Sequence, residues 1–244
     1  MRICAIGPSH LAALRTADQN GLFDTSGHEI DYMGHVWWVF GKIRLDGKRL
    51  FFDMNPPIRP LAPDLSTEVT VTDYDALLVH GVVAPATRIM EASGARRGTY
   101  SESMRRKVVE RALKRGRAFD CLAEIPKVFD GPVIVSPRPE KAVPSGAVVE
   151  DTGKGDVDDI NRLLSQVLSE MGIAYLPQPI KTVLNGRYTR REYSEGSLRL
   201  GERGGHKDED VLHMNEKYGA LVFNRALRLL TELKAVENSG ARAV

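Results

Sequence analysis

RICAIGPSHLAAL, residues 2–14, is the stretch that decides the fold. Its first half is a short apolar run that stops at Gly7-Pro8, which is typical of a buried strand in a parallel sheet. Its second half starts at Ser9, a residue type that caps helices, and continues as a helical pattern to about Asn20. A strand that leads directly into a helix is the first unit of an α/β fold.

The same alternation of apolar strand-like runs and helix-like segments continues along the chain. Strands are expected over 29–33, 76–80, 132–135 and 173–176, and helices over 101–117, 158–171 and from 215 to about 236. This order predicts a flavodoxin-like three-layer α/β sandwich with a central parallel sheet. The sequence shows no internal repeat and no linker, so residues 1–244 are expected to form a single domain.

Two insertions are predicted to decorate the sheet. Apolar runs at 36–40 and 50–52 flank the polar stretch 45–48, and its Asp-Gly pair favours a β-hairpin. The insertion is placed at about 35–65, because its second half is rich in proline and predicts an irregular loop. The polar, glycine-rich stretch at about 185–209 is expected to form a long loop.

Composition narrows the class of protein. An apolar content of 42% allows a sizeable core, and a net charge of +2 gives no reason to expect nucleic acid or an anionic membrane as partner. Cys4 and Cys121 do not make a disulfide framework. No apolar run reaches the roughly 18 residues of a membrane span, and the first residues lack a signal-peptide pattern. A cytoplasmic location is therefore expected.

Ser9 is the candidate nucleophile. It stands where the first strand passes into a helix, at the carboxyl edge of the sheet, where ligands of open α/β sheets gather. The free N–H groups of the helix start are suited to stabilise the oxyanion of an acyl-transfer intermediate. The alternative is that Ser9 only caps the helix. His10 is not expected to pair with Ser9 directly, because adjacent helical residues point about 100° apart.

A second motif lies near the other end of the chain. Asp210-Val211-Leu212-His213 precedes the last predicted helix. This spacing lets the Asp210 carboxylate reach Nδ1 of His213 and leaves Nε2 free to take a proton from Ser9. The alternative is that Asp210 caps the last helix and that His213 only packs.

The two motifs together resemble the SGNH/GDSL hydrolase superfamily. Its first block places the nucleophile after strand one, matching residues 6–9, and its last block is Asp-x-x-His, matching Asp210 and His213. The variant Gly-x-Ser-His-x-Ala-Ala-Leu is similar to SGNH-like proteins linked to surface polysaccharides and their acyl groups. The resemblance implies a serine-dependent ester hydrolase or O-acyltransferase in which Ser9 attacks, His213 carries the proton and Asp210 orients His213. The implied substrate is the acyl ester of a small molecule or a glycan, such as an O-acetyl ester.

The same resemblance implies where an oxyanion would be bound. The family uses a glycine after strand two, for which Gly34 is the candidate, with Gly41 behind it. Its third block, Gly-x-Asn-Asp, is absent here, because residues 80–83 are His80-Gly81-Val82-Val83. Loss of one such donor costs on the order of 10²–10³ in rate. We expect His80 or Arg138, each at the end of a predicted strand, to replace the asparagine, or His80 to close a loop hydrogen bond only. Gly81, which follows His80, is a further candidate for the same oxyanion or substrate site.

Two other functions stay open at this point. The missing asparagine is compatible with a scaffold that binds glycans or has a structural role and has lost catalysis. A weaker alternative is a flavodoxin-like module that binds phosphate or a nucleotide at the helix start after Pro8. The chain lacks the dinucleotide fingerprint, the P-loop and metal-ligand spacing, so no cofactor and no metal are expected. The oligomeric state is left open.

Two surface features complete the sequence analysis. The predicted helix 101–117 carries seven basic residues from Arg105 onward, which are expected to form a solvated face, with an acidic glycan contact as the alternative. Trp37 and Trp38 are expected to point to opposite sides of a strand. The arginine-bearing loop at 185–209 leads into Asp210 and is expected either to cover the site or to be mobile.

Overall fold

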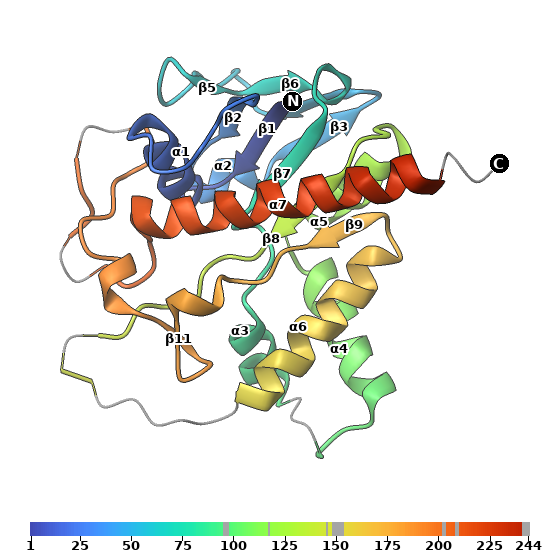
Figure 1. The fold of residues 1–244 in the computed structure, drawn as a ribbon, viewed down its shortest axis with the longest axis vertical. Coiled ribbons are helices and arrows are strands. Elements are labelled where there is room, and N and C mark those ends of the chain that lie inside the picture. Colours follow the sequence, from blue (N-terminus) through green and yellow to red (C-terminus); the bar gives the residue numbers. More distant parts are fainter. Residues whose placement is uncertain are drawn as a thin grey trace.

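A six-stranded parallel sheet forms the centre of the computed structural model, which describes residues 1–94, 98–116, 118–144, 146–147, 154–201, 204–207 and 210–240. The strand order is β5-β2-β1-β7-β8-β9 (Figure 1). The strands are β1 (Arg2–Gly7), β2 (Glu29–Gly34), β5 (Leu65–Ser66), β7 (Ala76–His80), β8 (Val133–Ser136) and β9 (Ile173–Tyr175). The order reverses between β1 and β7, so the site expected there lies at a topological switch point.

Helices cover both faces of this sheet. On one face α1 (Leu11–Gln19) packs beside α7 (Glu216–Gly240), as Figure 1 shows. The helices of the other face are α3 (Ala86–Ser93), α4 (Glu102–Lys114), α5 (Phe119–Glu124) and α6 (Lys154–Ser169). The prediction of a three-layer α/β sandwich with a parallel sheet is therefore confirmed.

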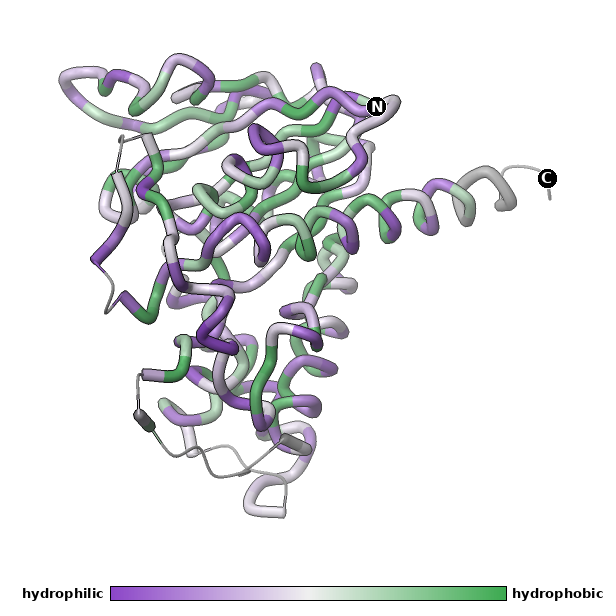
Figure 2. Tube along the Cα trace, turned by 60° about the vertical axis from the view of Figure 1, so that its left-hand side comes forward, coloured by the Kyte–Doolittle hydropathy of each residue, from purple (hydrophilic) through white to green (hydrophobic). Residues whose placement is uncertain are grey.

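A hydrophobic core lies on each face of the sheet, and successive side chains of a strand point alternately into these two cores. Ile3 and Ala5 of β1 face α1 and α7, whereas Cys4 and Ile6 face the opposite helices. Figure 2 shows hydrophobic and hydrophilic residues alternating along α7, the helix that leads to the C-terminus. A strand buried on both faces is a near-continuous apolar run, which explains why the sequence identified these strands well.

The predicted hairpin is present, but one of its arms was assigned wrongly. β3 (Ile43–Asp46) and β4 (Arg49–Phe52) pair across the turn, and β6 (Glu68–Thr70) adds a third antiparallel strand. Residues 36–40, expected as a strand, contain the short helix α2 (Trp37–Phe40) instead. A brief apolar run has no periodicity that separates strand from helix. The two tryptophans consequently do not point to opposite sides of a strand, and Trp38 is 61% exposed.

The stretch at 185–209 is largely irregular, with a few short elements at its start. β10 (Val183–Leu184) pairs with β11 (Tyr188–Thr189), and a 3-10 turn, η4, spans Arg191–Tyr193. Further 3-10 turns are η1 (Val71–Asp73), η2 (Ile125–Lys127) and η3 (Ile180–Thr182). Residues 202–203 and 208–209 of the predicted loop lie outside the described residues.

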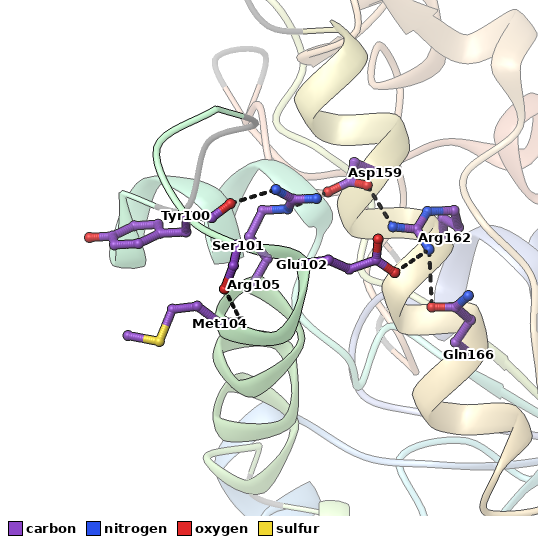
Figure 3. A network of polar contacts seen from close by, with 8 residues as sticks. All are labelled: Tyr100, Ser101, Glu102, Met104, Arg105, Asp159, Arg162 and Gln166. Atoms are coloured by element: carbon purple, nitrogen blue, oxygen red, sulfur yellow. Dashed lines mark hydrogen bonds and ion pairs between the residues drawn. The ribbon is translucent and has the colours of Figure 1, made fainter.

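The basic helix α4 differs from its prediction at one position. Arg105 is buried and forms an ion pair with Asp159 of α6 at 2.8 Å, so it is not part of a solvated face. Figure 3 shows that Arg162 binds the same carboxylate and also reaches Glu102. The predicted end of this helix, Arg117, lies outside the described residues.

Candidate active site

His213 lies within hydrogen-bonding distance of both Ser9 and Asp210 at the carboxyl edge of the sheet. Ser9 Oγ is 3.0 Å from Nε2 of His213, although the two residues are 204 positions apart. Nδ1 of His213 is 2.9 Å from Oδ2 of Asp210. This chain of contacts has the geometry required to deprotonate a hydroxyl through an imidazole that a carboxylate holds in one tautomer.

Ser9 does not cap helix α1. The N-cap position is His10, which has an αR backbone and makes no capping hydrogen bond through its side chain. The Ser9 hydroxyl is turned to His213 instead. Within the described chain, the backbone N–H groups of Ser9 and His10 donate no hydrogen bond, so both are open to a ligand at the helix start.

Asp210 is held by the turn that precedes α7. Its Oδ1 accepts hydrogen bonds from the backbone N–H of Leu212 at 2.7 Å and of His213 at 3.0 Å. Burial raises the pKa of Asp210, but the hydrogen bonds from His213 and the two backbone groups outweigh it, so the net pKa lies below the usual value. Asp210 does not cap the last helix, because Oδ1 of Asn215 accepts from the N–H of Lys217.

Three histidine rings are stacked at the site. His206 lies parallel to His213 with ring centroids 3.9 Å apart and an interplanar angle of 6°. His10 covers His213 with centroids 5.1 Å apart. Nδ1 of His206 is 3.1 Å from Oδ2 of Asp210, the oxygen that also faces His213. Burial, followed by the neighbouring His213, holds the pKa of His10 well below its usual value.

His206, Asp210 and His213 also have the composition of a metal site. Their candidate ligand atoms lie within 4.8 Å of one another. A metal ion binds an imidazole nitrogen along the lone pair, in the plane of the ring. The two rings are parallel, so one ion cannot lie in both planes, and their Nδ1 atoms already share one carboxylate oxygen. This stack therefore favours a hydrogen-bonded cluster over a metal centre.

The predicted glycine donors have different surroundings. The N–H of Gly81 donates to Ser136 at 3.0 Å and that of Gly41 donates to Trp37 at 3.2 Å, so neither is open to an oxyanion. Gly34 packs against Gly7, where a Cβ would lie 2.8 Å from the Gly7 carbonyl oxygen. Gly34 thus lets β2 lie close to the strand that carries Ser9.

The two predicted replacements for asparagine differ in accessibility. The His80 ring is completely buried beside Tyr218, and burial lowers its pKa to about 3. This position gives it no open face toward a substrate. The Arg138 guanidinium lies 5.9 Å from the Trp37 ring and borders open cavities, so it is the more accessible of the two.

A cavity of about 740 Å³ with many apolar wall residues is bordered by Arg138. Its wall includes Trp37 after β2, Val82 and Val83 after β7, and Arg138 after β8. Gly81, which precedes Val82, is in contact with His10. Ser9, His10 and His213 are not among the residues that line this cavity, but its apolar walls are of the kind that accommodates an acyl chain.

His206 is the residue of this cluster that the sequence analysis missed. Its position four residues before Asp210 was the available signal, since both flank the same short segment. The polar run around it was interpreted as loop. The stacking of His10 on His213 was also missed, because it joins the first and last motifs through the fold.

No known family model matches the chain, and none of the curated proteins is a significant match. Solved structures do align with most of it. A putative acylhydrolase from Bacteroides fragilis is 13% identical, with 95% of this chain and 87% of that chain covered and a TM-score of 0.46. The periplasmic domain of a lipopolysaccharide acetyltransferase from Salmonella ser. Paratyphi A is 14% identical, with 94% and 83% covered and a TM-score of 0.46.

A GDSL-like lipase from Bacteroides thetaiotaomicron is similar to the same extent, with 12% identity, coverage of 95% and 88%, and a TM-score of 0.43. Because the identities are at most 14% and the TM-scores lie below 0.5, we base the function on the side-chain geometry of the chain itself.

Proposed function

We propose that the protein is a serine-dependent ester hydrolase or O-acyltransferase that uses Ser9, His213 and Asp210. The observation that carries the proposal is the continuous contact from Ser9 Oγ to His213 Nε2 at 3.0 Å and from His213 Nδ1 to Asp210 Oδ2 at 2.9 Å. A serine hydroxyl is a weak nucleophile at its own pKa, and an adjacent imidazole base is one of the arrangements that activates it.

In the proposed reaction Ser9 Oγ attacks the ester carbonyl carbon while His213 Nε2 takes the hydroxyl proton. The tetrahedral intermediate collapses to an acyl-Ser9 ester, and His213 returns the proton to the leaving alcohol. Water or an acceptor hydroxyl then attacks the acyl group, and His213 again accepts the proton. As the bond between the acyl carbon and Ser9 Oγ breaks, His213 returns this proton to Ser9 Oγ, which restores the hydroxyl. Asp210 keeps the Nδ1 proton on the far side of the ring and stabilises the imidazolium.

The oxyanion is proposed to lie at the start of α1. Among the described residues, the N–H groups of Ser9 and His10 have no hydrogen-bond acceptor, and the positive end of the helix dipole favours a developing negative charge. Arg138 is the proposed supplementary group in place of the missing asparagine. Because it borders the cavities at this edge, it is accessible to a bound substrate.

The proposed substrate is the acyl ester of a small molecule or a glycan. The 740 Å³ cavity bordered by Arg138 suits the acyl portion, because its wall combines apolar side chains with a few arginines. Among the described helices, none has the length and hydropathy needed to cross a membrane. Hydrolysis and transfer differ only in whether water or a second hydroxyl reaches the acyl-enzyme.

Replacement of Ser9 tests the proposal. We expect Ser9→Ala to lower kcat/KM for a short-chain nitrophenyl ester by at least about 10³-fold, since the nucleophile is lost. A fluorophosphonate probe is expected to label the unmodified protein at Ser9 and to leave Ser9→Ala unlabelled. Steady-state kinetics and mass spectrometry of the labelled peptide provide the two readouts.

Ser165→Ala is the matched control, because this serine lies on the exposed side of α6. It should retain full turnover and labelling. Unchanged turnover in a folded Ser9→Ala protein would reject the mechanism. If neither protein hydrolyses esters but both bind glycans, the scaffold binds without catalysis.

A further inference from the structure

A large cavity with a cationic wall lies at the carboxyl ends of β8 and β9. It has a volume of about 910 Å³ and is bordered by the first half of α6, by the loop after β9 and by α7. Its wall carries the five basic residues Arg138, Lys181, Arg190, Arg225 and Arg228, together with two acidic ones, Asp158 and Glu140. The cavity therefore has a clear excess of positive charge.

The cationic side chains of this wall have no carboxylate partner in ion-pair distance in the described part of the chain. Burial lowers the pKa of both Arg138 and Arg225. Arg225 donates to the carbonyl oxygen of Pro177 at 2.7 Å, a neutral acceptor. Partly desolvated guanidinium groups without a counter-charge are unfavourable, and a bound anion would offset that cost.

Of the two acidic groups, Glu140 is hydrogen-bonded to a neutral residue and not to the cations of the wall. Its carboxylate accepts hydrogen bonds from the N–H and hydroxyl of Thr87, on α3. Burial raises the pKa of Glu140 to about 7, so near neutral pH it carries less than a full charge. Asp158 is then the main negative charge facing five cations.

The cavity adjoins the candidate active site through Arg138. This residue also lines the 740 Å³ cavity and a third one of about 330 Å³, whose wall includes Leu212 beside His213. The positive charge of Arg138 contributes to the lowered pKa of His10, which stacks on His213. Arg138 thus borders the cationic cavity and is also close enough to His10 to influence its charge.

The wall discriminates between classes of anion. Guanidinium groups bind carboxylate and phosphate through paired N–H donors. The wall contains no aromatic side chain among the described residues, so a nucleotide base would find no stacking platform. Asn161 and Asn224 lie among the cations and supply amide groups for hydroxyls. Charge, amides and volume together fit a chain of acidic sugars.

We propose that this cationic cavity binds the carboxylate groups of an acidic oligosaccharide and thereby presents a nearby O-acyl ester to Ser9. The part of the proposal that concerns the ester rests on the proposed function. The binding of the acidic oligosaccharide does not, because Ser9 contributes nothing to the wall of this cavity.

Calorimetric titration of the Ser9→Ala protein tests the inference without turnover. We expect an oligogalacturonate to bind about tenfold or more tightly than a neutral maltooligosaccharide of equal length, and added salt to weaken only the acidic ligand. Arg225→Gln/Arg228→Gln in the same background should lower affinity for the oligogalacturonate by about tenfold or more, with an unchanged melting temperature.

Lys107→Gln/Lys114→Gln is the matched control, since it removes the same charge from the exposed side of α4 and leaves the cavity intact. It should bind within about twofold of the parent. Equal binding of acidic and neutral sugars, or equal loss in both double variants, would overturn the proposal. Binding of inorganic pyrophosphate alone would also overturn it and assign the cavity to phosphate.

Nitrophenyl ester turnover is measured in parallel with intact Ser9. The Lys107→Gln/Lys114→Gln protein, whose changes lie outside both the candidate active site and the cationic cavity, is expected to retain turnover of this small neutral ester. If no protein hydrolyses the ester but the acidic oligosaccharide still binds selectively, the proposed function is rejected and the proposed binding site is retained. The two failures are therefore distinguishable.

Discussion

At the scale of single residues, the Ser9 hydroxyl is positioned by its neighbours. Gly81 has a φ of +79°, and a Cβ there would lie 2.8 Å from Cβ of His10. Glycine at this position lets the His10 ring approach and stack on His213. His213 is thus held between two rings while its nitrogens face Ser9 and Asp210.

Asp210 Oδ2 faces two imidazoles at once, which gives His206 a testable effect. His206→Phe keeps a stacking ring but removes the second hydrogen bond to Asp210. Because Asp210 Oδ2 then faces only His213 of the two imidazoles, its hydrogen bond with the imidazolium that forms during the reaction is strengthened. The acid limb of the kcat/KM profile is expected to move to higher pH, with kcat at its plateau changed by less than about tenfold.

The measurement is a pH series of nitrophenyl ester hydrolysis. His28→Phe is the control, because this residue directly precedes β2 at the opposite edge of the sheet. It should leave the profile unchanged. An acid limb that stays in place in a folded His206→Phe protein would show that the shared carboxylate does not matter for the base.

The sequence predicted the meeting of Ser9, Asp210 and His213 because each lies in a short motif beside a regular element. Asp210 and His213 are three positions apart, so their contact is nearly local. His206 could not be placed in the same way, since its orientation depends on an irregular segment. The oxyanion donors were equally hard to identify, because the occupancy of a backbone N–H depends on distant partners such as Ser136 for Gly81.

At the scale of elements, α4 and α6 are joined by a buried ion pair. Arg105 and Asp159 have side chains that are 9% and 5% exposed, and their closest atoms are 2.8 Å apart. Arg105 also donates to the Tyr100 carbonyl oxygen, and Arg162 donates to Asp159, as drawn in Figure 3. Burial of Asp159 raises its pKa, but the bond from Arg162 and the charge of Arg105 outweigh it and lower the net pKa.

Asp159→Asn is expected to destabilise the fold by roughly 3–5 kcal/mol, because it leaves the Arg105 guanidinium buried without its counter-charge. The double variant Arg105→Met/Asp159→Leu should regain most of that loss. Urea denaturation at neutral pH measures both. Since the folded pKa of Asp159 lies below the unfolded value of about 3.9, the pair stabilises above that pH and is lost as pH falls further.

Glu124→Gln is the control for this pair, because the Glu124–Lys127 ion pair on the surface is solvent-exposed. Its removal should change the free energy of unfolding by less than about 1 kcal/mol. Equal and small effects of both changes would mean that the α4–α6 pair contributes no more than a surface contact.

At this scale, the sequence predicted those elements well whose apolar pattern is long or whose strand is buried on both faces of the sheet. Strands β1, β2 and β7 and helix α6 follow the sequence closely. Helices α3 and α5, with eight and six residues, were not predicted, since such short segments hold barely two turns of pattern. The buried position of Arg105 was also missed, because its partner lies on another helix.

At the scale of the whole molecule, the two cores contain ionisable groups that respond to pH in opposite directions. Burial lowers the pKa of His80 to about 3 and holds that of His10 well below normal. Burial raises the pKa of Glu140 to about 7. The folded protein therefore prefers neutral histidines and a protonated Glu140, whereas the unfolded chain titrates near the ordinary values.

The sign of each contribution follows from proton binding. Between pH 3 and about 6.5 the unfolded chain binds more protons than the folded one at His80, so stability rises with pH there. Between about 4.3 and 7 the folded state binds more at Glu140, so that group makes stability fall with rising pH. The titrations of His10 and His80 together outweigh that of Glu140. The net free energy of unfolding should therefore increase from about pH 5 to 6.5.

His80→Leu isolates the larger slope. Neither ring nitrogen of His80 has a hydrogen-bond partner in the described chain, so leucine removes two unsatisfied polar atoms as well as the titration. The variant is expected to be more stable than the parent at both pH values. The difference in free energy of unfolding between the two proteins should be about 2 kcal/mol larger at pH 5 than at pH 6.5. Urea denaturation at the two pH values measures these free energies of unfolding. Glu140→Gln is the reciprocal control: it removes the opposing titration, so the free energy of unfolding should rise more steeply with pH than in the parent. If the free energies of unfolding of the parent and His80→Leu proteins depend on pH in parallel, burial does not keep the imidazole neutral.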